Sequence, residues 1–209
     1  MKYLQLLSLA AFIATPAFAA DKPGQKPAPA PSGTYVSDPA HSSVFWKVNH
    51  LGLSNFTARF TKMSAELVWN AEDPASSKVT AVIDPVSVQT NYPFPEKEDF
   101  DKEIGTTARF LAGDEIRFVS RSVKITGDKH GEVSGDLTMR GQTHPATLMV
   151  TFNGSMAQQP REKTPKIGFS AQAVLKRSEW GVVPEIKSIS DDVTVVIETE
   201  FQPPQTKSE

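Results

Sequence analysis

Apolar and polar residues alternate in short runs along most of this 209-residue chain. In the first run, Val44, Trp46 and Val48 share one face and are separated by Phe45 and Lys47. The later runs cover residues 56–60, 65–69, 79–83, 116–120, 133–139, 146–152, 167–175 and 193–201. Because successive side chains of a β-strand point to opposite faces, this period of two predicts strands with one buried face.

Turn-forming pairs separate several of these runs. Gly127-Asp128 lies between two of them, and Arg140-Gly141 and Asn153-Gly154 are typical of tight hairpin connections. Short strands joined by hairpins form antiparallel sheets, and about eight such strands leave no exposed edge when the sheet closes on itself. The pattern therefore predicts an all-β fold, an eight-stranded antiparallel barrel.

One segment between the strands follows a different pattern. Residues 96–111 are highly charged, and Phe100 and Ile104 stand four positions apart, so that they share one face of a helix. We expect a short helical insertion at this point, placed as a cap over one end of the barrel.

The two ends of the chain differ in composition from the region between them. Residues 1–19 contain an apolar run and end in the small-x-small motif Ala17-Phe18-Ala19, which predicts a cleavable signal peptide. The apolar run is about half of the ~20 residues that a membrane anchor needs, so we expect no membrane span in the mature protein. We interpret residues 20–33 as a Pro-rich flexible linker, 34–202 as the barrel domain and 203–209 as a loose tail.

Composition excludes several classes of function. The chain has no cysteine, which excludes disulfides, thiol chemistry and Cys-type zinc sites. Its formal net charge is −2, and basic residues are interspersed with acidic ones, so no basic block indicates a nucleic-acid partner. The sequence contains no glycine-rich phosphate loop, and we expect no cofactor.

The histidines and carboxylates form no recognisable active site. His41 and His50 flank one predicted strand and should lie at its two ends, roughly 30 Å apart if it is fully extended. The pair Asp191-Asp192 could be a two-carboxylate site, but it is more typical of a turn that enters a strand. We therefore predict no catalytic residue and no metal site.

A series of motifs follows one another between Tyr35 and Phe201. They are residues 38–44 (DPAHSSV), 49–54 (NHLGLS), 83–90 (IDPVSVQT), 135–145 (GDLTMRGQTHP), 168–171 (GFSA), 177–181 (RSEWG) and 190–193 (SDDV). In this order they resemble the YceI family, the bacterial polyisoprenoid-binding proteins, over essentially the whole barrel domain. The resemblance implies a periplasmic, lipocalin-like barrel that encloses a long isoprenoid or a similar amphiphilic chain.

The apolar faces leave open whether the barrel is filled or hollow. Periodicity alone favours a filled core, whereas small residues on the same faces, among them Ala81 and Ala171, would open a channel beside the aromatic rings. With the resemblance added, we expect the ligand-binding residues to be Trp46, Val48, Phe56, Phe60, Leu67, Trp69, Ile83, Phe118, Leu137, Met139, Val150, Phe152, Phe169, Ala171 and Trp180.

Three hypotheses follow for the function. The first is a periplasmic binding or carrier protein, not an enzyme, whose ligand is a polyisoprenoid, an isoprenoid quinone or a fatty-acid-like amphiphile. The second is a structural or partner-binding module with a filled core, which would dock a membrane redox protein. The third is an enzyme acting on such lipids through His41, Asp191 or Asp192 with Arg177, and it requires these groups to converge. The sequence leaves open whether the barrel forms a homodimer.

Overall fold

The computed structural model describes residues 28–205. The signal peptide predicted over residues 1–19 and the last four residues of the predicted tail lie outside the described residues. In this part of the chain, one α-helix, α1 (Phe100–Thr106), accompanies a sheet of eleven strands. The strands are β1 (Gly33–Ser37), β2 (Ser43–His50), β3 (Ser54–Phe60), β4 (Met63–Trp69), β5 (Lys78–Ile83), β6 (Val88–Gln89), β7 (Ile116–Gly127), β8 (His130–Met139), β9 (Gln142–Met156), β10 (Lys166–Lys176) and β11 (Ile189–Gln202).

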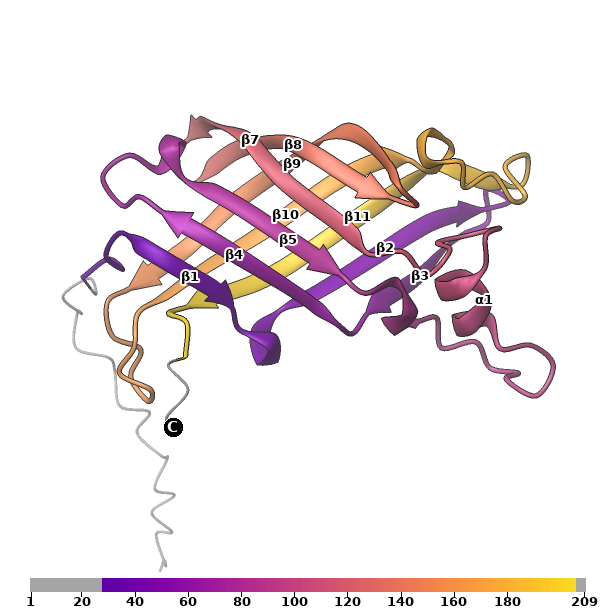
Figure 1. Cartoon of the computed structure of the whole chain (residues 1–209), viewed down its shortest axis with the longest axis horizontal. Coiled ribbons are helices and arrows are strands. Elements are labelled where there is room, and N and C mark those ends of the chain that lie inside the picture. Colours follow the sequence, from indigo (N-terminus) through magenta and orange to yellow (C-terminus); the bar gives the residue numbers. More distant parts are fainter. Residues whose placement is uncertain (1–27, 206–209) are drawn as a thin grey trace, which may run out of the picture.

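The sheet closes into a barrel because β11 pairs with two strands along its length. Its C-terminal end pairs with β1 and the rest with β2, so β1 and β2 are two halves of one long strand, interrupted by the 3-10 turn Pro39–His41. Strands β3 and β4, and then β5 and β6, continue one another in the same way. Counted so, eight antiparallel strands follow one another around the barrel in chain order, which confirms the predicted architecture (Figure 1).

Strand β1 was not among the runs that alternation predicts, although it completes the barrel. It pairs with β4 over residues 33–36 and with β11 at Val36 and Ser37. The residues just before it, which we expected to belong to the flexible linker, pack against the barrel: Ala30 is fully buried, and Ala157 donates its N–H to the carbonyl of Ala28 at 2.7 Å. The ordered domain therefore begins before residue 33.

One of the two predicted tight hairpins is confirmed. Arg140 and Gly141 alone connect β8 to β9, and both have positive φ angles (53° and 69°), as a two-residue turn between twisted strands requires. The prediction for Asn153-Gly154 is wrong, because both residues lie inside β9. The register against β10 shifts there, so that the pair forms a β-bulge rather than a turn.

The predicted helical insertion is α1, which lies at one end of the barrel (Figure 1). Asp99 begins it by accepting a hydrogen bond from the N–H of Lys102. Gly105 permits its close contact with the 3-10 turn Pro85–Ser87, because a Cβ at this position would lie 2.8 Å from the carbonyl oxygen of Pro85. Among the described residues, no helix is long and apolar enough to cross a membrane.

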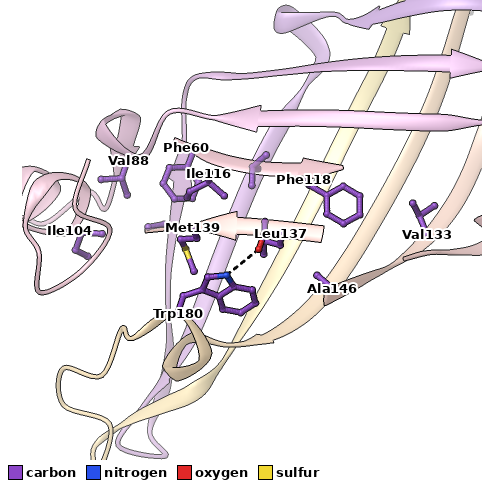
Figure 2. Packing of buried hydrophobic residues seen from close by; sticks show 12 residues of the cluster. Phe60, Val88, Ile104, Ile116, Phe118, Val133, Leu137, Met139, Ala146 and Trp180 are labelled. Atoms are coloured by element: carbon purple, nitrogen blue, oxygen red, sulfur yellow. Dashed lines mark hydrogen bonds between the residues drawn. The ribbon is translucent and has the colours of Figure 1, made fainter. Parts of the chain in front are cut away.

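The buried apolar side chains form two clusters. The first cluster is nearer α1 and includes Val44, Phe60, Phe118, Leu137 and Met139 (Figure 2). The second cluster lies around β1 and the C-terminal end of β11, and its buried members are Ala30, Tyr35, Ala65, Leu67, Ile167 and Phe201. The barrel interior thus has two halves, which we call the α1 half and the β1 half.

Candidate functional site: a cavity in the α1 half of the barrel

A cavity of about 550 Å³ occupies the α1 half of the barrel. Its walls come from the inward faces of the strands, including Val44 on β2, Phe60 on β3, Phe118 on β7 and Ala173 on β10. Helix α1 and the segment 182–189 also contribute to the lining, so they border one end of the cavity. The volume falls within the range typical of small-molecule sites, roughly 300–1,000 Å³, and most of the lining is apolar.

A row of aromatic rings runs along one side of this cavity. The Trp46 ring lies 6.0 Å from that of Phe56, Phe56 lies 5.9 Å from Phe100, and Phe100 lies 5.6 Å from Tyr92, measured between centroids. All four residues line the cavity. The row therefore joins the strand wall to the inserted helix and to the loop that precedes it.

In the β1 half, aromatic rings pack against one another, and none of the buried members of the second cluster lines this cavity. Trp69 stacks on Phe152 with the centroids 5.9 Å apart and the planes at 16°, and it also contacts Phe169 edge-on. Phe169 in turn contacts Phe201 at 6.0 Å. Ala81 packs against both clusters and lines the cavity, which places the inner end of the cavity beside it. The cavity thus ends inside the barrel against a packed core.

The residues that we expected to bind a ligand divide between these two halves. Eight of them line the cavity, and these are Trp46, Val48, Phe56, Phe60, Ile83, Phe118, Leu137 and Met139. Four belong to or pack against the cluster in the β1 half, and these are Leu67, Trp69, Phe152 and Phe169. Only the first group lines this cavity.

The other three predicted residues lie close to the α1-half core without lining the cavity. Val150 packs against the first cluster, and Ala171 is half-buried in β10, where it pairs with Val150 and Ile197. Trp180 is fully buried, and its indole N–H donates to the carbonyl of Leu137 at 3.2 Å (Figure 2). Trp180 therefore supports the wall at Leu137 and does not border the cavity.

Alternation along strands could not identify several lining residues, because they lie on α1 and in loops. They are Tyr92, Glu98, Phe100, Glu103, Ile104, Arg109, Phe110, Leu111, Val182, Pro184 and Glu185. The spacing of Phe100 and Ile104 was the one available signal, since it predicted an apolar helix face. That face covers the cavity.

Charged groups line the cavity only near α1 and the segment after β10. Arg109 lies between two carboxylates, with Glu103 and Glu185 each 3.3 Å from its guanidinium. A hydrogen bond with Glu103 raises the pKa of Glu98 above its ordinary value. Glu98 and Glu185 are exposed to solvent, so this group forms the mouth of the cavity.

Two buried or half-buried arginines brace the mouth through main-chain carbonyls. Arg177 donates to the carbonyl oxygens of Val182, Ile189 and Ser190 at 2.9–3.0 Å, and its burial lowers its pKa. Arg140, from the β8–β9 turn, donates to the carbonyl of Ala108 at 2.6 Å and to that of Trp180. These bonds hold the loops on either side of the opening in place.

A separate ionic cluster lies near the C-terminal end of β11. The ammonium of Lys166 contacts Asp38 at 2.7 Å and Glu162 at 3.0 Å, and it donates to Gln202 at 2.8 Å. Burial tends to raise the pKa of Asp38, but hydrogen bonds from Lys166 and His41 outweigh burial and lower the pKa to about 2. The bond to Asp38 correspondingly raises the pKa of His41.

The convergence that the enzyme hypothesis requires does not occur. His41 approaches Asp38 and Glu200 at one end of β11, whereas Asp191 bonds Ser178 at the other. Glu200 lies nine positions along the extended strand from Asp191, or about 30 Å away. Ligand-type atoms of Asp38, His41 and Glu200 lie within 4.8 Å of one another, but Asp38 already bonds both Lys166 and His41.

Fold and cavity together define a lipocalin-like barrel with an apolar internal cavity that opens near α1. The YceI-like domain model matches residues 35–201, and the chain belongs to this family. A relative named UPF0312 protein, from Pseudomonas fluorescens, is 32% identical over 146 residues, which are 68% of this chain and 71% of that protein.

Two solved structures share the fold at lower identity. Burkholderia cenocepacia BcnA superimposes with a TM-score of 0.66 at 19% identity, covering 78% of this chain and 98% of BcnA. A polyisoprenoid binding domain from Saccharophagus degradans gives a TM-score of 0.54 at 15% identity, covering 83% of this chain and 99% of that domain. At these identities the likeness concerns the fold alone.

Proposed function

We propose that this protein binds an isoprenoid or a similar single-chain amphiphile inside the α1 half of the barrel and carries it without chemical change. The cavity of about 550 Å³, with its mostly apolar lining, is the observation on which the proposal rests. Membership of the YceI-like family supports the same class of ligand, since one structural neighbour is described as a polyisoprenoid binding domain.

The cavity volume sets the size of the ligand. A methylene group takes up about as much space as a water molecule, roughly 30 Å³ in the liquid, so 550 Å³ holds roughly eighteen carbon atoms. Burial of that many groups contributes about 14 kcal/mol at ~0.8 kcal/mol each, which lies below the practical affinity limit near 20 kcal/mol. A much longer polyprenyl chain would have to leave part of its length outside the mouth.

The location proposed for this activity is the periplasm, reached through the signal peptide predicted over residues 1–19. A carrier in an aqueous compartment must hide an apolar chain from water, and a cavity closed at its inner end does this. The separation of His41 from Asp191 supports binding over catalysis. Formation of a homodimer and docking to a membrane redox protein are separate hypotheses, and the binding proposal requires neither of them.

Organic extraction of the purified protein, followed by mass spectrometry, tests the proposal. We expect an amphiphile of about C15 to C20 to co-purify or to be taken up when added. The Ala173→Trp variant should abolish uptake, because Ala173 is buried and lines the cavity. Val174→Trp is its matched control, since the neighbouring side chain points outward and is 60% exposed.

Two outcomes of the uptake experiment would contradict the proposal. If neither co-purified nor added amphiphiles are found in the wild-type protein, or if Ala173→Trp takes them up as well as Val174→Trp does, the cavity is not the binding site. Circular dichroism spectra of both variants establish that each is folded.

A further inference from the structure

The polar groups of the cavity lining are concentrated at its mouth, and their charges are unequal. Three carboxylates, those of Glu98, Glu103 and Glu185, line the cavity together with two guanidinium groups, those of Arg109 and Arg177. His50 also lies on the lining. With the histidine neutral, the formal charge of the lining is therefore negative.

Both guanidinium groups already have partners. Arg109 contacts Glu103 and Glu185, one on each side, at 3.3 Å. Arg177 is buried, and its hydrogen bonds to three main-chain carbonyl oxygens direct it toward the segment 182–190. An anionic head group would have to compete with two carboxylates for Arg109 and would also be repelled by Glu98.

Hydrogen-bond acceptors, in contrast, are plentiful at the mouth. Carboxylates accept several hydrogen bonds and donate none when ionised, so they suit a hydroxyl, amide or ammonium group. A hydrogen bond links Glu98 to Glu103, and the side chain of Glu185 is 67% exposed even though it pairs with Arg109. The aromatic row ends beside them at Tyr92.

We propose that the site selects amphiphiles whose head group donates hydrogen bonds and is uncharged or cationic, and that it disfavours phosphate and carboxylate heads. This inference rests on the proposed binding function and adds the chemistry of the head group to it. The carboxylates at the mouth are the specificity-determining groups, and Arg109 is held by them instead of being available to an anion.

Competition between two ligands with one chain and different heads tests the proposal. Geranylgeraniol and geranylgeranyl phosphate are each titrated against the neutral probe N-phenyl-1-naphthylamine bound to the wild-type protein, at pH 8 and low salt. We expect the alcohol to bind at least about tenfold more tightly than the phosphate. Geranylgeranyl amine should bind at least as tightly as the alcohol.

Removal of the two carboxylates beside Arg109 should reduce this preference. In the Glu103→Gln/Glu185→Gln variant, we expect phosphate affinity to rise about tenfold while alcohol affinity changes less than twofold. Glu66→Gln/Glu72→Gln removes the same charge from exposed positions outside the cavity lining and should leave the ratio unchanged. If the double variant is unstable, Glu185→Gln alone should shift the ratio in the same direction.

The competition titrations have three outcomes that would contradict a part of this reasoning. Equal or tighter binding of the phosphate to the wild-type protein overturns the head-group inference and leaves the binding function intact. A ratio unchanged in both Glu103→Gln/Glu185→Gln and Glu185→Gln overturns the role of these carboxylates. Failure of all three ligands and the probe to bind overturns the proposed function itself, and the inference with it.

Discussion

The two halves of the barrel interior are lined by similar residues, yet one is hollow and the other is filled. Trp46 in the α1 half contacts one other ring, that of Phe56, and borders the cavity. Trp69 in the β1 half contacts both Phe152 and Phe169 and does not line this cavity. Among the described residues, neither indole N–H has a hydrogen-bond partner, so the packing around the two rings is the main difference between them.

The two ends of the barrel are covered by different segments, which explains why one half is hollow and the other is filled. In the β1 half, strand β1 and the segment just before it cover the barrel end, and Ala30 and Tyr35 pack into the interior. In the α1 half, the end is covered by α1 and loops, whose side chains, such as that of Ile104, pack on the first cluster and line the cavity. The β1 half is therefore packed around its aromatic rings, and the proposed binding site lies in the α1 half.

The largest expected effect comes from removing the tryptophan of each half. Trp69→Ala should lower the free energy of unfolding by about 3–5 kcal/mol, because it removes packed contacts and leaves a new void. Trp46→Ala should lower it by less than about 2 kcal/mol, since the ring already borders an empty space. Urea unfolding measures both values, and equal losses would contradict the division into a filled and a hollow half.

The second prediction concerns the ionic cluster in the β1 half. The pKa of Asp38 is about 2 in the folded protein, whereas the ordinary pKa of an aspartate side chain is 3.8. A lowered folded-state pKa means that the carboxylate contributes stability that is fully present above about pH 4 and is lost as the pH falls through 2. The shift corresponds to about 2 kcal/mol at neutral pH.

Asp38→Asn removes this contribution, so wild type and variant should differ by about 2 kcal/mol at pH 7 and hardly at all near pH 2. Unfolding in urea across this range provides the measurement. A difference that stays constant with pH would show that Asp38 contributes through its shape and not through its charge. Ligand uptake should be unaffected at pH 7, because Asp38 does not line the cavity.

The smallest expected effect concerns the covering of the cavity. Gly105→Ala places a Cβ 2.8 Å from the carbonyl oxygen of Pro85, so α1 must shift away from the turn beneath it. We expect a loss of about 1 kcal/mol, the clash outweighing the better helix propensity of alanine. Hydrogen exchange should increase in α1 and not in β10.

Lys102→Ala, at an exposed position of the same helix, serves as the control for Gly105→Ala. It should change neither exchange nor ligand release. Ligand release from Gly105→Ala should be faster than from the wild type, because the helix bearing Phe100 and Glu103 borders the cavity. Unchanged release would mean that the ligand leaves by another route.

Much of the architecture could be predicted from local sequence patterns. The alternation of Val44, Trp46 and Val48 with outward-facing neighbours corresponds to β2, and the Arg140-Gly141 pair forms the predicted hairpin. The spacing of Phe100 and Ile104 predicted α1. Strand β1 escaped prediction because it is short and has little alternation, and Asn153-Gly154 was misplaced because a bulge uses the same residue types as a turn.

The candidate site could be predicted only in part, for a geometric reason. Alternation reports which face of a strand points inward, and by this measure Trp46 and Trp69 are equivalent. It carries no information on the position of a residue along the barrel axis. For that reason eight of the predicted binding residues line the cavity, while residues such as Phe169 fill the opposite half.

The sequence by itself determined the all-β barrel class, the inserted helix, the absence of cysteine and the membership of its family, because these depend on local pattern and motif order. Only the tertiary structure decided where the interior is empty and where it is filled. It also brought Glu98, Glu103, Arg109 and Glu185 to one opening from two distant segments. The physical reason is that space inside a barrel depends on how the two ends are covered, and that covering comes from residues far apart in the chain.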